Sequence, residues 1–411
     1  MQDAVAGLSL QRLERITDLL EQTYVAPGLI PGCQVLVARR GEIAYQRTFG
    51  LMDRERQRPW MPDTLVRIYS MTKPIVSIAL MMLWERGLFQ LDEPVTYWLP
   101  EWADQRVWVS GGQGGADMLT QASDRAVSFR QLLSHTAGLT YGAVLETVGI
   151  AGQRHPVDEA YASLRVRQEA SEDLDAFVAK LGKVPLRYPP GTRWMYSLAT
   201  DVVGALVQRI SGRPLDEFLG EEIFAPLKML DTGFQVSEGA ADRFAACYAR
   251  RRDGIALQDD PRSSPYLKRP AFLSGGGGLV STAGDYYRFC EMLRRGGELD
   301  GARLIGSRTL ALMTQNQLPG GASLADLALD SFSETTPAGV GFGLGFAMTV
   351  DGVRAGSPSQ GDYYWGGAAS TLFWVDPIEQ LVVMFLSQLL PSTTFNFRGQ
   401  LKNIIYAALN D

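Results

Sequence analysis

A serine and a lysine separated by two residues carry the sharpest chemical signal in the chain, in Ser70-Met71-Thr72-Lys73. The apolar run 75–83 follows, and Pro74 fits a first helical turn because amides there have no intrahelical acceptor to lose. We therefore expect Ser70 at the amino terminus of a helix and Lys73 one turn along on the same face. A serine needs a base to become a nucleophile, and lysine can serve if burial lowers its pKa enough to leave it neutral.

Two later segments could complete such a site, because S-x-x-K alone also describes a capping serine with a solvated lysine. Tyr196 stands on a loop just before a helix that begins at Ala199, and a phenol beside a lysine can relay protons. Trp365-Gly366-Gly367-Ala368 is predicted to begin the strand of the last hairpin. Its glycines leave an open edge for substrate, and a backbone N–H there could join that of Ser70 in an oxyanion hole. For either segment, the alternative is a packed core aromatic beside a turn.

Other chemistries lack support in the sequence. The only histidines are His135 and His155, and no G-x-S-x-G nucleophile elbow is present, so His135 is predicted to be structural. No H-E-x-x-H, P-loop or EF-hand pattern occurs, and 275–278 is predicted to be closely packed backbone rather than a phosphate loop. The three cysteines have no metal-ligand spacing. Metal and nucleotide chemistry therefore have no local support in the sequence.

Composition narrows the class of protein. The 411 residues carry a formal net charge of −6, with 46% hydrophobic and 20% charged residues, as in ordinary globular proteins. This mild acidity gives no electrostatic reason to expect nucleic acid or an anionic membrane as a partner. No secretory signal is visible at the amino terminus, and the longest apolar runs fall short of the ~20 residues that span a bilayer. The expectation is a soluble, cytoplasmic protein.

Hydrophobic periodicity predicts an α/β protein of the α+β type. Residues 33–38 with 43–45, and 371–375 with 381–386, each read as a hairpin, so both ends of the chain are expected to build one antiparallel sheet flanked by helices. The predicted domains are 1–90 with 261–411 for the sheet, and 91–260 for a mostly helical part with long loops near 110–116 and 185–191.

Further elements follow from the same patterns. Helices are predicted after Ser9, which can cap the first one, near the carboxyl end at 401–409, and at 202–210 before Gly212. A strand is predicted over 340–346, with large residues on one face and glycines on the other. A bare glycine face indicates close packing or a strand that borders a substrate cleft.

Taken together, these segments resemble the family VIII carboxylesterases, which are esterases of the class C β-lactamase and penicillin-binding-protein superfamily. The resemblance rests on Ser70-Met71-Thr72-Lys73, Tyr196-Ser197 and Trp365-Gly366-Gly367. Supporting stretches at 87–95, 132–139 and 274–282 extend it along nearly the whole chain. It implies an antiparallel sheet flanked by helices, a helical second domain, a cleft between them, and no cofactor.

The resemblance also implies residue roles. Ser70 would be the acylated nucleophile, Lys73 its base and Tyr196 the proton-relaying partner. The N–H groups of Ser70 and Ala368 would form the oxyanion hole, and Trp365 would line the acyl site.

Two departures from the superfamily bear on the substrate. Trp365-Gly366-Gly367 stands where β-lactamases and peptidoglycan peptidases carry K-T-G or H-T-G, so the cation that binds a substrate carboxylate is missing. Leu198 replaces the usual asparagine two residues after the tyrosine, which removes an amide that would hold an acylamino side chain. Trp365, Gly366, Gly367 and Leu198 are therefore the candidate substrate-binding residues, and they favour a neutral, apolar acyl ester.

The sequence thus predicts a serine hydrolase of short-chain carboxylic esters, with a small-molecule ester as its partner. Three alternatives stay open: a β-lactamase or D-alanyl-D-alanine carboxypeptidase, an acyltransferase that passes the acyl group to an alcohol, and a non-catalytic penicillin-binding sensor.

Overall fold

The computed structural model describes residues 3–112, 117–142, 155–167, 171–328 and 338–410. Within these residues, one sheet of eight strands forms the centre, and every neighbouring pair is antiparallel. Its strands, in spatial order, are β14 (Val340–Phe342), β15 (Ala347–Thr349), β16 (Tyr363–Gly367), β17 (Thr371–Asp376), β18 (Leu381–Ser387), β3 (Gly32–Arg39), β4 (Glu42–Asp53) and β5 (Arg58–Pro59). The sheet therefore joins both ends of the chain, as predicted.

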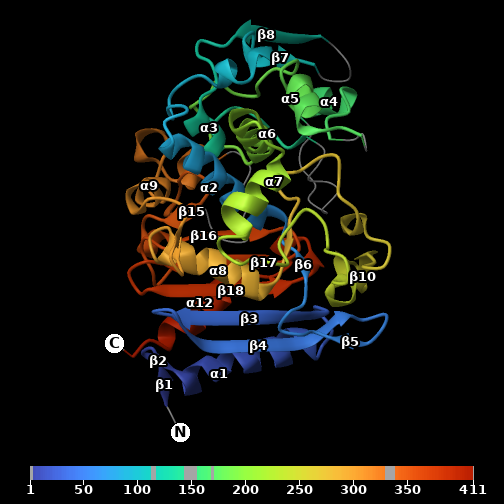
Figure 1. The fold of residues 1–411 in the computed structure, drawn as a ribbon, viewed down its shortest axis with the longest axis vertical. Helices are drawn as coiled ribbons and strands as arrows, with labels where there is room; N and C mark the ends of the chain where they lie inside the picture. Colours follow the sequence, from blue (N-terminus) through green and yellow to red (C-terminus); the bar gives the residue numbers. More distant parts are fainter. Residues whose placement is uncertain (1–2, 113–116, 143–154, 168–170, 329–337, 411) are drawn as a thin grey trace.

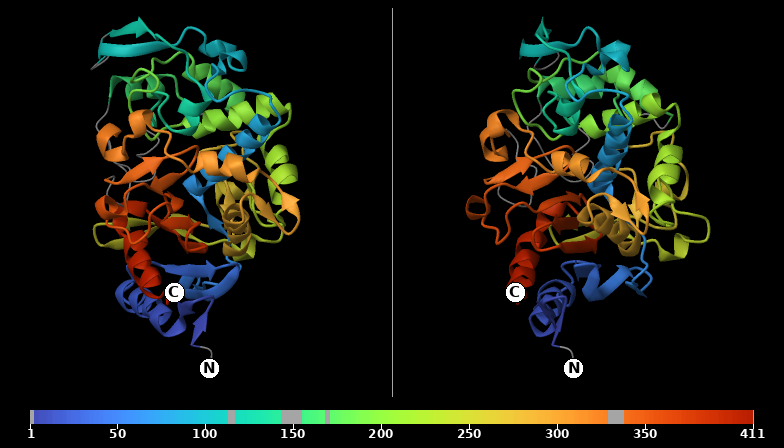
Figure 2. Two further views of the ribbon diagram at one scale, coloured as in Figure 1. Left: turned by 90° about the vertical axis from the view of Figure 1, so that its left-hand side faces the viewer. Right: turned by 60° about the vertical axis from the view of Figure 1, so that its left-hand side comes forward.

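Helices cover both faces of this sheet. α1 (Leu10–Asp18) and α12 (Phe397–Ala407) pack together on one face, while α8 (Ala283–Arg294) packs against β17 and β18 on the other (Figures 1 and 2). Every residue of β3 and β18 is buried, which explains why both strands are mostly apolar rather than alternating between apolar and polar residues. The predicted hairpins around Arg40-Gly41 and before β18 are both present.

The three predicted helices also form. Ser9 caps α1 by accepting the N–H of Arg12, and α6 (Ala199–Ser211) ends at Gly212, whose φ of 71° suits a glycine. α6 packs against α2 (Thr72–Glu85), a helix whose residues from Thr72 to Leu83 are all buried.

The helical part lies at the end of the molecule away from the two termini (Figure 1). Its further helices are α3 (Phe129–Leu133), α4 (Pro156–Ser163), α5 (Leu174–Leu181) and α7 (Leu215–Leu219). The predicted fold class, an antiparallel sheet flanked by helices beside a mostly helical part, is confirmed.

Strands also occur where loops and helices were expected. β7 (Arg106–Gly111) and β8 (Met118–Ala122) form a hairpin that includes part of the loop predicted near 110–116, of which 113–116 lie outside the described residues. β8 is half-exposed to fully exposed throughout, so it lacks the apolar alternation by which a strand is recognised. β9 (Cys247–Arg251) pairs with β10 (Gly254–Asp259) and with β19 (Leu389–Leu390), so the strands just before residue 260 lie with the sheet-forming part.

Two predicted strands need correction. Trp365, Gly366 and Gly367 do not begin the last hairpin, because they end the preceding strand, β16, which turns tightly into β17 through Ser370 at a φ of 59°. The strand predicted over 340–346 stops at Phe342, because the chain turns there: the Gly343 N–H donates to the Phe346 carbonyl, and Gly345 adopts a φ of 96°. The glycines after it are closely packed: a Cβ on Gly345 would lie 2.3 Å from the Ser77 hydroxyl. The packing interpretation is therefore confirmed.

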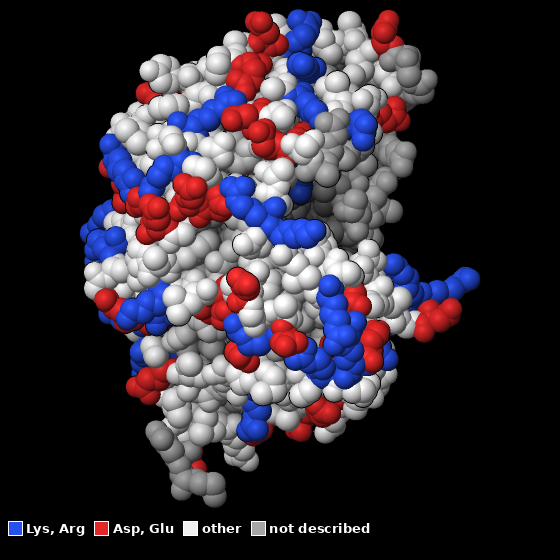
Figure 3. Space-filling view, turned by 45° about the vertical axis from the view of Figure 1, so that its right-hand side comes forward, with Lys and Arg blue, Asp and Glu red and all other residues white. Residues whose placement is uncertain are grey.

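Other global features follow. No helix among the described residues is long and apolar enough to cross a membrane, and no group of His, Cys, Asp and Glu there could hold a metal ion. The three cysteines are buried and free. On the face shown in Figure 3, basic and acidic side chains are interspersed rather than gathered by sign.

Candidate active site

Ser70 lies in a tight turn that joins the sheet-forming part to α2. β6 (Val66–Arg67) leads into the 3-10 turn η2 (Tyr69–Met71), and Thr72 then begins the helix. Tyr69 has a φ of 42°, a conformation uncommon for a bulky residue and one that concentrates at functional sites. The turn is held from outside by Tyr286, whose hydroxyl donates to the Met71 carbonyl at 2.9 Å. Ser70 is thus presented by a backbone that its surroundings fix.

Lys73 is buried, at 1% exposed, and its side-chain nitrogen has three oxygen neighbours. Nζ lies 3.0 Å from Ser70 Oγ, 2.8 Å from the Tyr141 hydroxyl and 2.6 Å from the Gly276 carbonyl. The helical spacing predicted from the sequence therefore does bring Lys73 to the serine, and the carbonyl and phenol were not anticipated.

Tyr196 approaches the serine from the helical part. Its hydroxyl donates to Ser70 Oγ at 2.7 Å, and Lys73 Nζ lies 4.7 Å from the centre of its ring. The segment is positioned by the Met195 N–H, which donates to the His135 carbonyl at 2.9 Å, and by α6, which begins at Ala199. The structure therefore brings together the serine, lysine and tyrosine singled out in the sequence.

This geometry suits proton transfer away from the serine. The Gly276 carbonyl can only accept, so it takes one N–H of Lys73, and the Tyr141 oxygen can take a second. In a neutral lysine the lone pair is then left to accept the Ser70 hydroxyl proton. Tyr196 meanwhile donates to the serine oxygen, which places a second proton carrier on the same atom.

Tyr141 is the functional candidate that the sequence did not reveal. Burial raises the pKa of Tyr141 well above its ordinary value, and the neighbouring Tyr196 and Asp201 raise it further. The phenol therefore stays protonated while its oxygen accepts from Lys73. Tyr141 follows the stretch 132–139, but no spacing rule connects it to Ser70, so only the folded chain identifies it.

The end of β16 lies against the turn that carries Ser70. A Cβ on Gly367 would lie 2.3 Å from the Ile68 carbonyl, and Ala368 packs in one small cluster with Tyr69. Among the described residues, β15 pairs only with Tyr363 and Tyr364 of this strand, so the stretch from Trp365 to Gly367 has no β15 partner. An open edge for substrate along this stretch stays a prediction.

Aromatic side chains surround the tyrosine. The Trp365 ring lies 5.3 Å from that of Tyr196 and 5.3 Å from that of Phe342, measured between centroids. Leu198, in contrast, has no exposed surface and packs in the core, with its N–H on the Thr140 carbonyl at 3.1 Å. The structure therefore brings Trp365 to the site and leaves Leu198 in the core, away from any surface that a substrate could touch.

His135 is buried beside these rings. Its Nδ1 lies 3.2 Å from the Ser197 hydroxyl, and its ring centroid lies 5.1 Å from that of Tyr196. Burial first, and then the charge of Lys73, hold the pKa of His135 well below its usual value. The imidazole ring of His135 is therefore neutral and packs against Tyr196, consistent with the structural role expected for it.

The fold and the Ser–Lys–Tyr arrangement define a serine hydrolase of the β-lactamase fold. A family model described as "Beta-lactamase" matches residues 17–405, and the chain belongs to this family. The resemblance noted from the sequence is thereby confirmed.

Relatives refine the comparison. The chain is 35% identical to "Esterase EstB" of Burkholderia gladioli over 375 residues, which cover 87% of this chain and 85% of the relative. It is 29% identical to "Acyltransferase calJ" of Penicillium decumbens, covering 81% and 78% of the two chains. Among solved structures, "EstCE1, a hydrolase with promiscuous acyltransferase activity" matches with a TM-score of 0.77 at 27% identity, covering 98% of this chain and 99% of that one.

Proposed function

We propose that the protein is a carboxylesterase that cleaves short-chain esters through a covalent acyl-enzyme on Ser70. The observation that carries the proposal is the position of Ser70 Oγ, 3.0 Å from Lys73 Nζ and 2.7 Å from the Tyr196 hydroxyl. A serine held between a buried amine and a phenol has both a base and a proton donor in contact.

In the proposed reaction, Ser70 Oγ attacks the ester carbonyl as its proton passes to Lys73. The oxyanion is stabilised by the backbone N–H groups of Ser70 and Ala368. The tetrahedral intermediate collapses when Tyr196 protonates the leaving alcohol and Lys73 returns a proton to the tyrosine. Water then attacks the acyl-enzyme, gives up its proton by the same route, and releases the acid with Ser70 regenerated.

The surroundings of the serine favour a neutral acyl group. Trp365 packs on Tyr196 and Phe342, so an apolar wall stands where related enzymes place a cation for a substrate carboxylate. A β-lactam or peptide carboxylate would lose its charge-assisted partner at this wall. An ester with a short apolar acyl chain needs none.

The test is steady-state hydrolysis of p-nitrophenyl butyrate by the wild type and by Ser70→Ala. We expect turnover by the wild type and loss of nearly all of it in the variant. Ser77→Ala is the matched control, because Ser77 lies on the same helix, is buried, and has a hydroxyl without a hydrogen-bond partner among the described residues. A chromogenic cephalosporin turned over faster than the butyrate would instead favour a β-lactamase.

Acyl transfer is the second candidate, favoured by the names of two relatives, an acyltransferase and a hydrolase with promiscuous acyltransferase activity. The same acyl-enzyme would then be attacked by an alcohol. Adding a primary alcohol and measuring the ratio of new ester to free acid distinguishes the two. An ester yield above that expected from the alcohol's share of the solvent would indicate a transferase.

A further inference from the structure

A buried carboxylate, that of Asp201, lies behind the proposed active site. Asp201 is on the first turn of α6, five residues after Tyr196, and is completely buried. One carboxylate oxygen accepts the Gly276 N–H at 2.9 Å and the Ser274 hydroxyl at 2.6 Å, and the other lies 3.2 Å from Arg167 Nη1. Burying a carboxylate costs free energy unless it is paired. The hydrogen bonds and the arginine contact of Asp201 offset this cost and tie the carboxylate to the residues around it.

The loop that Asp201 binds is pressed onto α6. A Cβ on Gly276 would lie 2.9 Å from the Asp201 carboxylate, and a Cβ on Gly275 would lie 2.5 Å from the Thr200 carbonyl. No other residue type fits so near the helix without displacing the loop. The close packing predicted for 275–278 is thus confirmed, and the group against which Gly276 packs is the Asp201 carboxylate.

The same glycine receives the lysine. The Gly276 carbonyl accepts from Lys73 Nζ at 2.6 Å, which is the shortest of the three contacts of that nitrogen. Asp201 binds both the Gly276 N–H and the Ser274 hydroxyl. The Gly277 N–H, which shares a peptide plane with the Gly276 carbonyl, donates to the Ser274 carbonyl at 3.3 Å, so Asp201 restrains the loop on both sides of that carbonyl. A chain of contacts therefore runs from Asp201 through Gly276 to Lys73 and Ser70.

We propose that Asp201 is a positioning residue that holds the Gly276 carbonyl where it orients the Lys73 amine toward Ser70. The inference rests on the proposed role of Lys73 as the base for Ser70. Because α6 also follows directly from the Tyr196 segment, the amino-terminal end of this helix positions both Lys73, the proton acceptor, and Tyr196, the proton donor. A displaced amine slows proton transfer without altering the surface that binds substrate.

The test compares Asp201→Ala and Asp201→Asn with the wild type in ester hydrolysis. We expect kcat to fall about 10- to 100-fold in Asp201→Ala, with KM within about twofold, because small misplacements of a catalytic group carry penalties of this size. Asp201→Asn keeps an oxygen acceptor for Gly276, so it should recover part of the loss. A purely structural role predicts no such recovery and no separation of kcat from KM.

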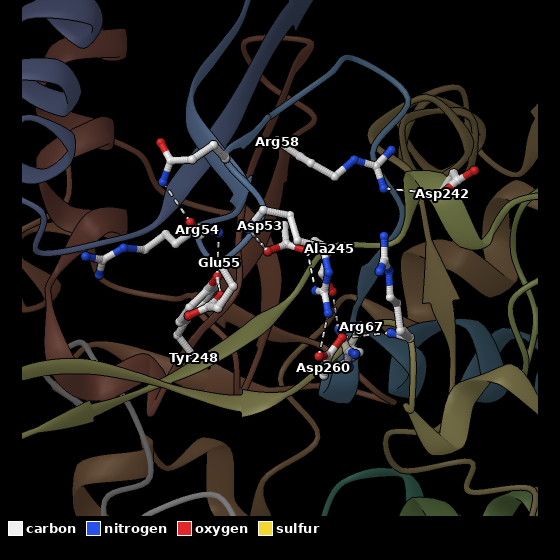
Figure 4. Close-up of polar contacts among 12 residues, drawn as sticks. Asp53, Arg54, Glu55, Arg58, Arg67, Asp242, Ala245, Tyr248 and Asp260 are labelled. Carbon is white, nitrogen blue, oxygen red and sulfur yellow. Dashed lines mark hydrogen bonds and ion pairs between the residues drawn. The ribbon is translucent and has the colours of Figure 1, made fainter.

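Asp53→Ala is the matched control. Asp53 is also a buried carboxylate that accepts one backbone N–H and one arginine, both from Arg56, and it lies in the polar cluster shown in Figure 4. We expect Asp53→Ala to lower the melting temperature but to keep kcat. Equal losses of kcat in Asp53→Ala and Asp201→Ala, at equal losses of stability, would overturn the proposal.

A double-mutant cycle with Gly276→Ala tests the route of the effect. The added methyl group contacts the carboxylate when Asp201 is present but has space in Asp201→Ala. The loss of transition-state stabilisation in the double variant should therefore be clearly smaller than the sum of the losses in the two single variants. Additive losses would mean that Asp201 acts elsewhere, and would overturn the proposal.

Labelling of Ser70 by a fluorophosphonate probe separates this inference from the esterase proposal. The labelling rate reports activation of the serine without any ester turnover. If the wild type labels but does not hydrolyse esters, the esterase proposal fails, and slower labelling of Asp201→Ala still supports the positioning role. A wild type that does not label overturns both.

Discussion

Lys73 is surrounded by oxygen atoms on three sides, and the Tyr141 hydroxyl is the one of these that belongs to no sequence motif. A phenol that stays protonated can hold an amine in place while leaving its lone pair free for the serine. This division of labour distinguishes Tyr141 from Tyr196, whose hydroxyl contacts the serine itself. The two tyrosines are therefore expected to have different roles, and a Tyr→Phe substitution, which removes only the hydroxyl oxygen, tests the role of each.

Tyr141→Phe should lower kcat/KM for p-nitrophenyl butyrate by about 10- to 100-fold, because the lysine loses one of its fixed partners. The matched control is Tyr24→Phe, which removes a buried phenol that binds Gln400 at 2.6 Å. Steady-state kinetics and thermal melts of both variants make the measurement. Unchanged kinetics in Tyr141→Phe would exclude a catalytic task for this phenol.

His135 makes a prediction about stability and pH. Its pKa is well below the usual value in the folded protein, so below about pH 6.5 the unfolded chain binds more protons at this position. The free energy of unfolding must then fall as the pH falls from 7.5 to 5.5, because the unfolded chain gains a proton at this position that the folded protein does not. His135→Asn should lose that part of the pH dependence, and asparagine tolerates the φ of 54° found there. Urea unfolding at both pH values provides the check, and equal slopes for the two proteins would contradict the assignment.

At the scale of elements, the relation between β16 and the turn η2 sets the geometry of the site. Gly367 touches the Ile68 carbonyl without a side chain between them, so the end of the strand lies directly against the segment that presents Ser70. Arg398 of α12 holds the same strand from behind by donating to the Trp365 carbonyl at 3.2 Å. The end of β16 is therefore held on two sides.

Gly367→Ala should separate strand and turn, because the new Cβ would lie 2.3 Å from the Ile68 carbonyl. We expect kcat for the butyrate ester to fall by about 100-fold, the penalty typical of a 1 Å displacement. Gly220→Ala is the control, since nothing lies within 4 Å of a Cβ at that helical position. Kinetics of the two variants at equal protein concentration decide the matter, and a Gly367→Ala variant as active as the control would show that this contact is not needed.

For the whole molecule, much of the architecture is readable from the sequence, because buried strands such as β3 and β18 are mostly apolar. The helix after Ser70 and the caps at Ser9 and Gly212 can also be predicted, because their signals lie in neighbouring residues of the sequence. The β7–β8 hairpin is not, since it lies at the surface and carries no apolar alternation. In the site, spacing along one helix indicates Lys73. Tyr141 contacts Lys73, and Asp201 reaches it through Gly276, only because the fold brings distant segments together.

The buried cysteines allow a prediction about the folded molecule as a unit. Burial raises the pKa of Cys247 to about 11 and also raises the pKa values of Cys33 and Cys290. Thiolates are the reactive form, so the native protein should react slowly or not at all with a disulfide reagent at pH 8. After unfolding in guanidinium, all three should react. Fast reaction of any thiol in the native state would reveal an opening that the packed fold does not show.

The pairing of β3 with β18 has a consequence for synthesis on the ribosome. Arg39 faces Leu381, so the β3–β4 hairpin of the nascent chain leaves the exit tunnel long before β18, the strand that pairs with the other edge of β3. At a synthesis rate of ~5–20 residues per second, that edge stays unpaired for some tens of seconds before β18 is made. During this interval the hairpin offers unpaired backbone groups to other chains, which is how edge strands aggregate. Production of the protein should therefore be sensitive to temperature and to chaperone supply, even though the finished sheet protects that edge.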